Sequence, residues 1–249
     1  MGSFVLPLGC ALSRPHQFVL YPDFLSIAEQ HTLLHASLEK LDRTLTPSRD
    51  VRRRRRTWVQ SGHPLDPRNG EFLPDDMYDF EEGHFDGVIK FYREMHLTSW
   101  PPDESLTSTV SAVPPLSSIV ARLHALFMSH VSARSQRRPA LQTHLLHLAS
   151  NGAIFPHVDN VEASGGTIMG VSLGAERVMR LVRRRRESPE YQSKLEVMPP
   201  SFDVDEIRYT YDHSILATAI FKGRNIEAGQ RLSVMIRVRA VFLSFNLIS

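Results

Sequence analysis

Apolar residues recur at two different intervals along the chain, and the interval changes past the middle of the sequence. Over residues 24–45, leucines and isoleucines recur mainly at steps of three and four residues, which predicts an amphipathic helix with Asp23 as its N-cap. The same spacing predicts a helix over residues 85–95, and another that Ser117 caps and that runs through Phe127. The front of the chain is therefore expected to be helical.

Beyond the middle of the chain, the apolar runs become short and are separated by turn residues. The runs cover residues 145–149, 154–159, 168–173 and 178–182, and the turn signals include Asn151-Gly152 and Gly165-Gly166. Short runs at fairly regular spacing predict a sandwich or barrel, not alternating strands and helices. We therefore expect an α+β protein with a mainly β core and N-terminal helices packed on its sheet.

Length and composition narrow the class of protein further. The 249 residues suit a single domain, expected over residues 18–249, after an N-terminal extension over residues 1–17 that is compatible with targeting. The net charge is only +2, and a single cysteine, Cys10, excludes an internal disulfide framework and a Cys-rich zinc site. Apolar stretches near the C-terminus are interrupted by Arg237 and Arg239, so we expect no membrane span. We also expect a monomer.

Candidate metal ligands lie at the end of the second short apolar run. Strand periodicity puts His157 and Asp159 on one face, about 7 Å apart along the strand. With His213 as a third ligand they would form a two-histidine, one-carboxylate triad, which leaves positions open on Fe(II) for a cosubstrate and O₂. The alternative is that His157 is a hydrogen-bonded core histidine, because His-x-Asp alone is a weak signal.

A second His-x-Asp pair occurs at His84 and Asp86. It opens the segment predicted to be helical, where side chains two residues apart point away from each other and cannot share a metal ion. We therefore predict that this pair is not the metal site.

The last long apolar run places two arginines on one face of a predicted strand. Strand alternation puts Arg231, Ser233, Met235 and Arg237 on that face. Two inward arginines would be costly to bury without an anion, and a dicarboxylic acid would supply one, with Arg231 and Ser233 binding its distal carboxylate. The alternative is that both arginines point outward from an exposed sheet.

The order His157-x-Asp159, His213, then Arg231 and Arg237 six positions apart resembles the AlkB family of dioxygenases. The resemblance implies a double-stranded β-helix, or jelly roll, that binds Fe(2+), 2-oxoglutarate and O₂. It also implies oxidative decarboxylation of 2-oxoglutarate to succinate and CO₂, coupled to hydroxylation of a C–H bond. The likeness extends to a mitochondrial member of the family and implies a mitochondrial location, with the cytoplasm or nucleus as alternatives.

Two departures from the family's nucleotide-repairing members bear on the substrate. Leu146 and Leu148 stand where those members carry an Asn-x-Tyr pair, and residues 99–118 show no pattern of a base-flipping lid. We therefore expect a protein or small-molecule substrate. The alternatives are oxidative demethylation of methylated RNA or DNA, and a non-catalytic, metal-containing binding module.

Two arginine runs, Arg52 to Arg56 and Arg183 to Arg186, are candidate contacts for nucleic acid phosphates. No aromatic residues interleave the runs as stacking platforms would, so a solvated face is the competing interpretation. Acidic proteins and membrane lipids are equally suitable partners for such runs.

Overall fold

The computed structural model describes residues 18–65, 72–102, 114–131, 140–158, 164–183, 194–197, 201–204 and 211–239. The predicted extension over residues 1–17 lies outside these ranges, as does Arg184 to Arg186 of the second arginine run. None of the helices in the described ranges has the length and apolar content needed to cross a membrane.

Four helical segments occur in the described residues. They are α1 (Ile27–Thr44), α2 (Arg49–Gln60), the 3-10 helix η1 (Asp75–Met77) and α3 (Leu116–His130). The prediction of α1 is confirmed, but its N-cap is Ser26, which forms a capping box with Glu29, and Asp23 lies in a turn with φ of 59°. Ser117 is likewise not a cap, because α3 begins one residue before it, after Pro115.

The strands make a mainly antiparallel β core, as predicted. They are β1 (Phe18–Leu20), β2 (Glu81–Gly83), β3 (Ile89–Leu97), β4 (Leu141–His157), β5 (Ser164–Gly174), β6 (Met179–Arg183), β7 (Lys194–Val197), β8 (Ser201–Val204), β9 (Tyr211–Ile215), β10 (Ala219–Phe221), β11 (Arg224–Ile226) and β12 (Arg231–Arg239). Ten of them form one sheet in the order β1-β8-β5-β12-β4-β9-β6-β7, with β3 pairing β4 and β2 pairing β3.

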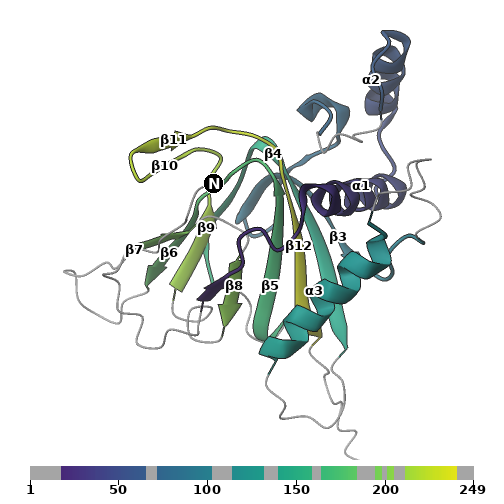
Figure 1. Ribbon diagram of the computed structural model, residues 1–249. Helices are drawn as coiled ribbons and strands as arrows, with labels where there is room; N and C mark the ends of the chain where they lie inside the picture. Colours follow the sequence, from purple (N-terminus) through teal and green to yellow (C-terminus); the bar gives the residue numbers. More distant parts are fainter. Residues whose placement is uncertain are drawn as a thin grey trace, which may run out of the picture.

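The long strand β4 belongs to two groups of strands. Its first part pairs with β12, where Leu145 lies opposite Val234, and its last part pairs with β9, where His157 lies opposite His213. One group is therefore β1-β8-β5-β12-β4-β3-β2 and the other is β4-β9-β6-β7, the two-sheet arrangement of a double-stranded β-helix (Figure 1). The predicted jelly roll with helices packed on the sheet is confirmed.

Helices α1 and α3 cover one face of the larger group of strands (Figure 1). Their buried side chains pack against alternate residues of β12, β4 and β5, including Leu33, Leu41, Ile119, Leu123, Phe127, Leu145, Val171, Leu232, Val234 and Ile236. Burying each of these side chains contributes roughly 1.5–3 kcal/mol. Because Leu232 and Val234 face the helices, Arg231 and Ser233 face the other side of the sheet.

The predicted helix over residues 85–95 is wrong, because this segment is a turn followed by β3. Ile89 and Tyr92 both pack in one apolar cluster although they are three positions apart in the sequence. The register shifts between Lys90 and Tyr92, where residues 149–152 of β4 lie opposite Phe91 alone, and the φ of 50° at Phe91 interrupts the strand alternation of β3. This interruption imitates a helical period in the sequence.

The turns predicted at Asn151-Gly152 and at Gly165-Gly166 are also wrong. Asn151 and Gly152 lie within β4, where a Cβ on Gly152 would come within 2.6 Å of the Phe91 carbonyl oxygen. Gly152 therefore permits close approach of β3 instead of reversing the chain. Gly165 and Gly166 lie within β5.

Candidate active site

His157 and His213 meet across paired strands. His157 ends β4, His213 lies in the middle of β9, and their Cα atoms are opposite each other in the antiparallel register. Their ring centroids are 6.1 Å apart with the planes inclined at 58°. A histidine nitrogen binds a metal ion at about 2.1 Å, so rings this close can converge on one ion.

Backbone carbonyls fix the orientation of both rings. His157 Nδ1 lies 3.0 Å from the Phe155 oxygen, and His213 Nδ1 lies 3.3 Å from the His157 oxygen. A carbonyl oxygen only accepts, so each Nδ1 carries the proton and each Nε2 carries the lone pair. Metal-binding histidines usually donate their second nitrogen in this way, which suits Nε2 as the ligand atom.

Asp159, the expected carboxylate ligand, lies outside the described residues, which end at Val158 in this segment. Within the described ranges, no group of three or more histidine, cysteine or acidic side chains could hold a metal ion. The carboxylate of the predicted triad thus has no described position.

Arg231 and Ser233 place buried polar groups at the start of β12. Their exposed fractions are 5% and 3%, and Arg231 Nε donates to Ser172 Oγ at 2.7 Å. Arg231 Nη1 and Ser233 Oγ have no hydrogen-bond partner among the residues that the structure describes. Buried polar groups in folded proteins are nearly always paired, and among the unpaired groups of the described residues these two lie on one face of β12, which makes them candidates for binding a ligand.

The charge of Arg231 is uncompensated in its surroundings. Burial, with a smaller contribution from the nearby cation Arg177, lowers the pKa of Arg231 to about 9. The guanidinium is still charged at neutral pH, and a buried charge without a counter-ion is unfavourable. A bound anion would offset this cost.

Two leucines of the neighbouring strand β4 lie beside these donors on the same face of the sheet. Leu148 lies opposite Arg231 and Leu146 lies opposite Ser233, and both pack with Tyr92 and Met235. The unpaired donors therefore border an apolar surface that suits the methylene groups of a dicarboxylic acid. The outward orientation considered for this strand is wrong for Arg231.

Arg237 lies six residues beyond Arg231, on the same face of β12. It is partly buried, and its Nε donates to Gln142 Oε1 at 3.2 Å across the strand pair. The two predicted arginines thus lie on one face of β12. Arg231 is buried beside leucines, whereas Arg237 is only partly buried and contacts Gln142.

The turn from His84 to Val88 lies beside the end of β4, since Phe155 N donates to the Val88 oxygen at 2.8 Å. His84 Nδ1 is 2.9 Å from Asp86 Oδ1, so the two side chains meet. The helical argument against this pair as metal ligands is therefore wrong, although no third ligand joins it in the described ranges. The Val88 amide donates to Asp86 and lowers the pKa of its carboxyl.

A second carboxylate lies near this turn on β3. His144 Nε2 is 2.9 Å from Glu94 Oε2, and His84 Nε2 is 3.9 Å from Glu94 Oε1. The hydrogen bond with His144 lowers the pKa of Glu94. Asp86 and Glu94 thus give this side of the site an acidic rim.

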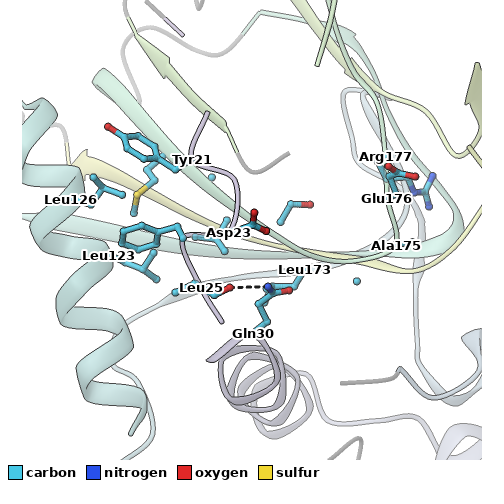
Figure 2. A pocket seen from close by; sticks show the side chains of 16 residues that line it. Tyr21, Asp23, Leu25, Gln30, Leu123, Leu126, Leu173, Ala175, Glu176 and Arg177 are labelled. Carbon is cyan, nitrogen blue, oxygen red and sulfur yellow. Dashed lines mark hydrogen bonds between the residues drawn. The ribbon is translucent and has the colours of Figure 1, made fainter. Parts of the chain in front are cut away.

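A cavity of about 290 Å³ lies elsewhere, between α3, the segment before α1 and β5 (Figure 2). Tyr21, Leu123 and Leu126 line its apolar side, and Gln30 donates to the Leu25 oxygen at 2.9 Å. None of the predicted metal or cosubstrate residues lines this cavity, although Ser172, which accepts from Arg231, does.

Two mammalian proteins are similar to this chain over most of its length. The Bos taurus protein described as "Alpha-ketoglutarate-dependent dioxygenase alkB homolog 7, mitochondrial" is 30% identical over 224 residues, which cover 88% of this chain and 77% of the relative. The Mus musculus protein of the same description is 30% identical over 223 residues, with the same coverage. This chain belongs to the AlkB-homologue dioxygenase family. It is an Fe(II)- and 2-oxoglutarate-dependent dioxygenase that uses O₂.

Solved structures that resemble this AlkB homologue are more distant in sequence. The structure of OsALKBH1 is 16% identical with a TM-score of 0.44 and covers 90% of this chain and 97% of its own. A Pseudomonas putida prolyl-4-hydroxylase is 11% identical with a TM-score of 0.46 and covers 90% and 94%. No protein-family model matches the sequence. The family assignment therefore rests on the two mammalian relatives.

One buried arginine of this AlkB homologue was not singled out from its sequence. Arg177 is 1% exposed and donates to backbone carbonyls from three segments, including Ser150 at 2.8 Å, Leu216 at 2.9 Å and Gly229 at 2.5 Å. It therefore joins the bend of β4 to the approaches of β10 and β12. A lone arginine in an irregular segment produces no periodic signal by which this role could be found.

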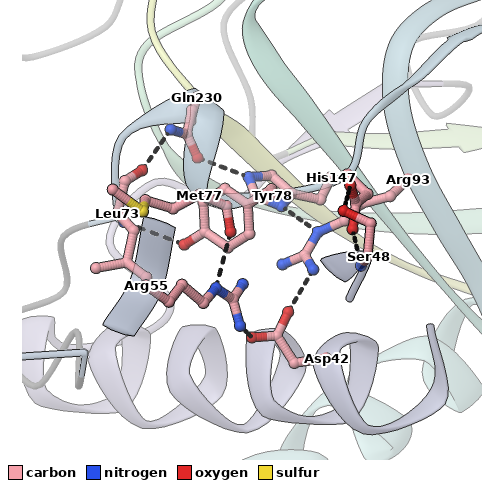
Figure 3. Close-up of polar contacts among 10 residues, drawn as sticks. Asp42, Ser48, Arg55, Leu73, Met77, Tyr78, Arg93, His147 and Gln230 are labelled. Carbon is pink, nitrogen blue, oxygen red and sulfur yellow. Dashed lines mark hydrogen bonds and ion pairs between the residues drawn. The ribbon is translucent and has the colours of Figure 1, made fainter. Parts of the chain in front are cut away.

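A buried polar network on the helix-covered face was also missed (Figure 3). His147 is fully buried, accepts from Arg93 Nε at 3.0 Å and contacts Gln230 Oε1 at 2.9 Å. Arg93 continues to Asp42 on α1, which also accepts from Arg55 Nη1 at 2.7 Å. These residues come from α1, α2, β3, β4 and the entry to β12, so sequence spacing does not reveal them.

Proposed function

We propose that this enzyme holds Fe(II) with His157, Asp159 and His213, and binds the distal carboxylate of 2-oxoglutarate with Arg231 and Ser233. Arg237, on the same face of β12, belongs to the same cosubstrate site. The unpaired Arg231 Nη1 and Ser233 Oγ are the single observation on which this assignment depends. The donor set fits the cofactors, because it combines two imidazoles and a carboxylate with an anion site on an apolar wall.

Bound Fe(II) supplies the O₂ activation by which decarboxylation of 2-oxoglutarate drives hydroxylation of a C–H bond. The protein contributes preorganised groups. The Phe155 and His157 carbonyls hold the two imidazoles in one tautomer, and Arg231 keeps its buried charge unpaired until a carboxylate arrives. Leu146 and Leu148 exclude water beside the donors, which strengthens the charge-assisted hydrogen bonds.

The substrate that we propose is a protein or a small molecule, not a nucleic acid. Leu146 and Leu148 are buried apolar residues where nucleotide-repairing relatives carry an Asn-x-Tyr pair. Asp86 and Glu94 add carboxylates beside the site, and these would repel a phosphate backbone. Because both mammalian relatives are described as mitochondrial, we also propose that this enzyme works in mitochondria.

The test is a coupled product assay with Fe(II)-loaded enzyme. Succinate should form together with a hydroxylated peptide or metabolite from a mitochondrial extract, and methylated oligonucleotides should give neither formaldehyde nor extra succinate. Formaldehyde that matches succinate mole for mole on methylated RNA would overturn the substrate proposal and leave the cosubstrate assignment intact. Failure to turn over 2-oxoglutarate with every substrate would contradict the assignment of the site.

Oxidative demethylation of RNA is the second candidate function. The observation in its favour is the exposed row of arginines on α2, which phosphates could contact. It requires salt-sensitive binding of RNA that depends on these arginines, and the same product assay distinguishes the two substrates.

A further inference from the structure

Helix α2 projects from the body of the molecule and has two dissimilar sides (Figure 1). On the inner side, residues that recur at helical spacing attach the helix to neighbouring segments. Val51 is buried, Arg54 and Arg55 donate to the carbonyl oxygens of Asp76 and Met77, and Trp58 packs beside η1. The N-cap, Ser48, is in turn bound through its backbone nitrogen and hydroxyl to Asp79, at 2.6 and 2.7 Å. The helix is therefore firmly anchored along one side.

The outer side borders a groove of about 790 Å³. Arg49, Arg52 and Arg56 line this groove at the spacing i, i+3, i+7 and are exposed. Within the described residues, none of these three arginines forms an ion pair or a hydrogen bond, whereas Arg53, which does not line the groove, lies 3.5 Å from Asp50. Like charges four residues apart, as in Arg52 and Arg56, destabilise an isolated helix by about 0.2–0.5 kcal/mol.

The groove also presents apolar surface. Val59 is 48% exposed and Leu65 is 40% exposed, and both line the groove together with Pro47. A concave strip of apolar side chains bordered by unpaired arginines is complementary to an acidic amphipathic helix, which places carboxylates and apolar residues at the same helical interval.

Two other classes of partner fit the groove less well. Single-stranded nucleic acid binds through exposed aromatic rings, but the Trp58 ring stacks on His63 at 4.3 Å and its Nε1 donates to the Pro64 oxygen at 3.2 Å. A bilayer needs a convex or flat apolar surface, whereas Val59 and Leu65 lie in a hollow. The geometry favours a protein segment.

We propose that the groove along α2, lined by Arg49, Arg52, Arg56, Val59 and Leu65, is a docking site for an acidic amphipathic helix of a partner protein. This site is separate from the residues that bind iron and 2-oxoglutarate. It would bring the enzyme to a substrate protein or to an assembly without altering the chemistry.

Fluorescence anisotropy on the full chain tests this proposal with two labelled probes of equal negative charge, and co-sedimentation with vesicles that contain anionic lipid tests a membrane partner. The first labelled probe is a stabilised peptide helix with glutamates at i, i+4 and i+7 and leucines on the adjoining face, and the second is an oligouridylate. We expect the peptide to bind most tightly at physiological salt. The Arg52→Glu/Arg56→Glu double variant should weaken it roughly tenfold or more, and Val59→Ser should weaken it several-fold.

Arg53→Glu is the matched control, because Arg53 lies on the same helix, is exposed and does not line the groove. It should change peptide affinity less than threefold, and all these surface variants should retain the wild-type thermal midpoint and basal succinate formation. Tighter binding of oligouridylate or vesicles than of peptide would overturn the proposal. So would absence of peptide binding, or equal losses of peptide affinity from Arg53→Glu and from the single variant Arg52→Glu, which changes the same amount of charge.

Discussion

Two buried polar regions lie on opposite faces of the same strands, and they differ in how their charges are compensated. On the helix-covered face, Arg93 has a counter-ion in Asp42, donates to His147 and lies 4.3 Å from the centre of the Tyr78 ring, although its Nη2 has no hydrogen-bond partner among the described residues. On the other face, Arg231 has only the hydroxyl of Ser172 among described partners. Leu232, between Arg231 and Ser233, belongs to the helix-covered core.

The difference separates structural polar groups from binding groups. A buried network whose charges are matched fixes how helices sit on a sheet, and removing one member leaves the others without partners. An unmatched guanidinium beside leucines costs stability in the free enzyme, and in the proposed site it would gain its counter-ion from 2-oxoglutarate. Substitutions on the two faces should therefore differ in their effects on stability and on ligand binding.

The largest expected effect comes from Asp42→Asn. It leaves Arg93, which is 3% exposed, without a full counter-charge, and we expect a loss of about 3 kcal/mol in the free energy of unfolding. Urea denaturation would measure it, and the Asp42→Asn/Arg93→Met double variant should recover part of the loss. A single variant as stable as wild type would show that the network does not hold α1.

One substitution made on both faces gives the next largest contrast. Arg93→Met should lose about 2 kcal/mol because His147 Nδ1 and Asp42 lose their donor, whereas Arg231→Met should change stability by less than ~1 kcal/mol or increase it. Denaturation of the cofactor-free proteins compares the two. Equal losses would contradict the view that Arg231 is uncompensated.

Ser233→Ala should affect the ligand and not the fold. The Ser233 hydroxyl has no described partner, so its removal should leave the thermal midpoint unchanged. A hydrogen bond to a carboxylate contributes about 1.5 kcal/mol, which corresponds to roughly tenfold weaker 2-oxoglutarate binding. Isothermal titration with 2-oxoglutarate measures this, and unchanged affinity together with lost stability would reverse the assignment.

The smallest effect is a pH dependence that arises from His147. Burial, and then the charge of Arg93, holds the pKa of His147 well below its usual 6.5. Below pH 6.5 the unfolded chain binds a proton that the folded protein does not, so stability should fall with falling pH by up to about 1.4 kcal/mol per unit. His147→Gln should remove this contribution to the pH dependence of the unfolding free energy. Identical pH dependences in the variant and the wild type would contradict the prediction.

The sequence predicts those parts of the fold that depend on periodicity. The leucines of α1, the short β runs and the alternation in β12 each predicted their element, because burial on one face imposes a period. The predictions failed where a local irregularity of the backbone interrupts the strand alternation. The register shift at Phe91 gave the β3 sequence a helical spacing. Gly152 was predicted to lie in a turn, but it lies within β4, where the absence of a side chain allows close approach of β3.

For the candidate site, the sequence predicted individual residues but not the contacts around them. His157, His213 and Arg231 occur in recognisable order and spacing, and the structure brings the two histidines together and buries the arginine. Arg177 and His147 were missed because their partners are backbone carbonyls and side chains from distant segments. Such contacts depend on the tertiary fold and leave no local pattern in the sequence.

The most direct test of the central claim is an anaerobic titration of the Fe(II)-loaded protein with 2-oxoglutarate, followed by its visible charge-transfer band. Wild type and Arg93→Met should saturate at similar concentrations, and Arg231→Met should need at least ~30-fold more 2-oxoglutarate, because it loses a buried charge-assisted pair of about 2 kcal/mol or more. Equal affinity in Arg231→Met and wild type would contradict the claim that the unpaired guanidinium on this face binds the cosubstrate.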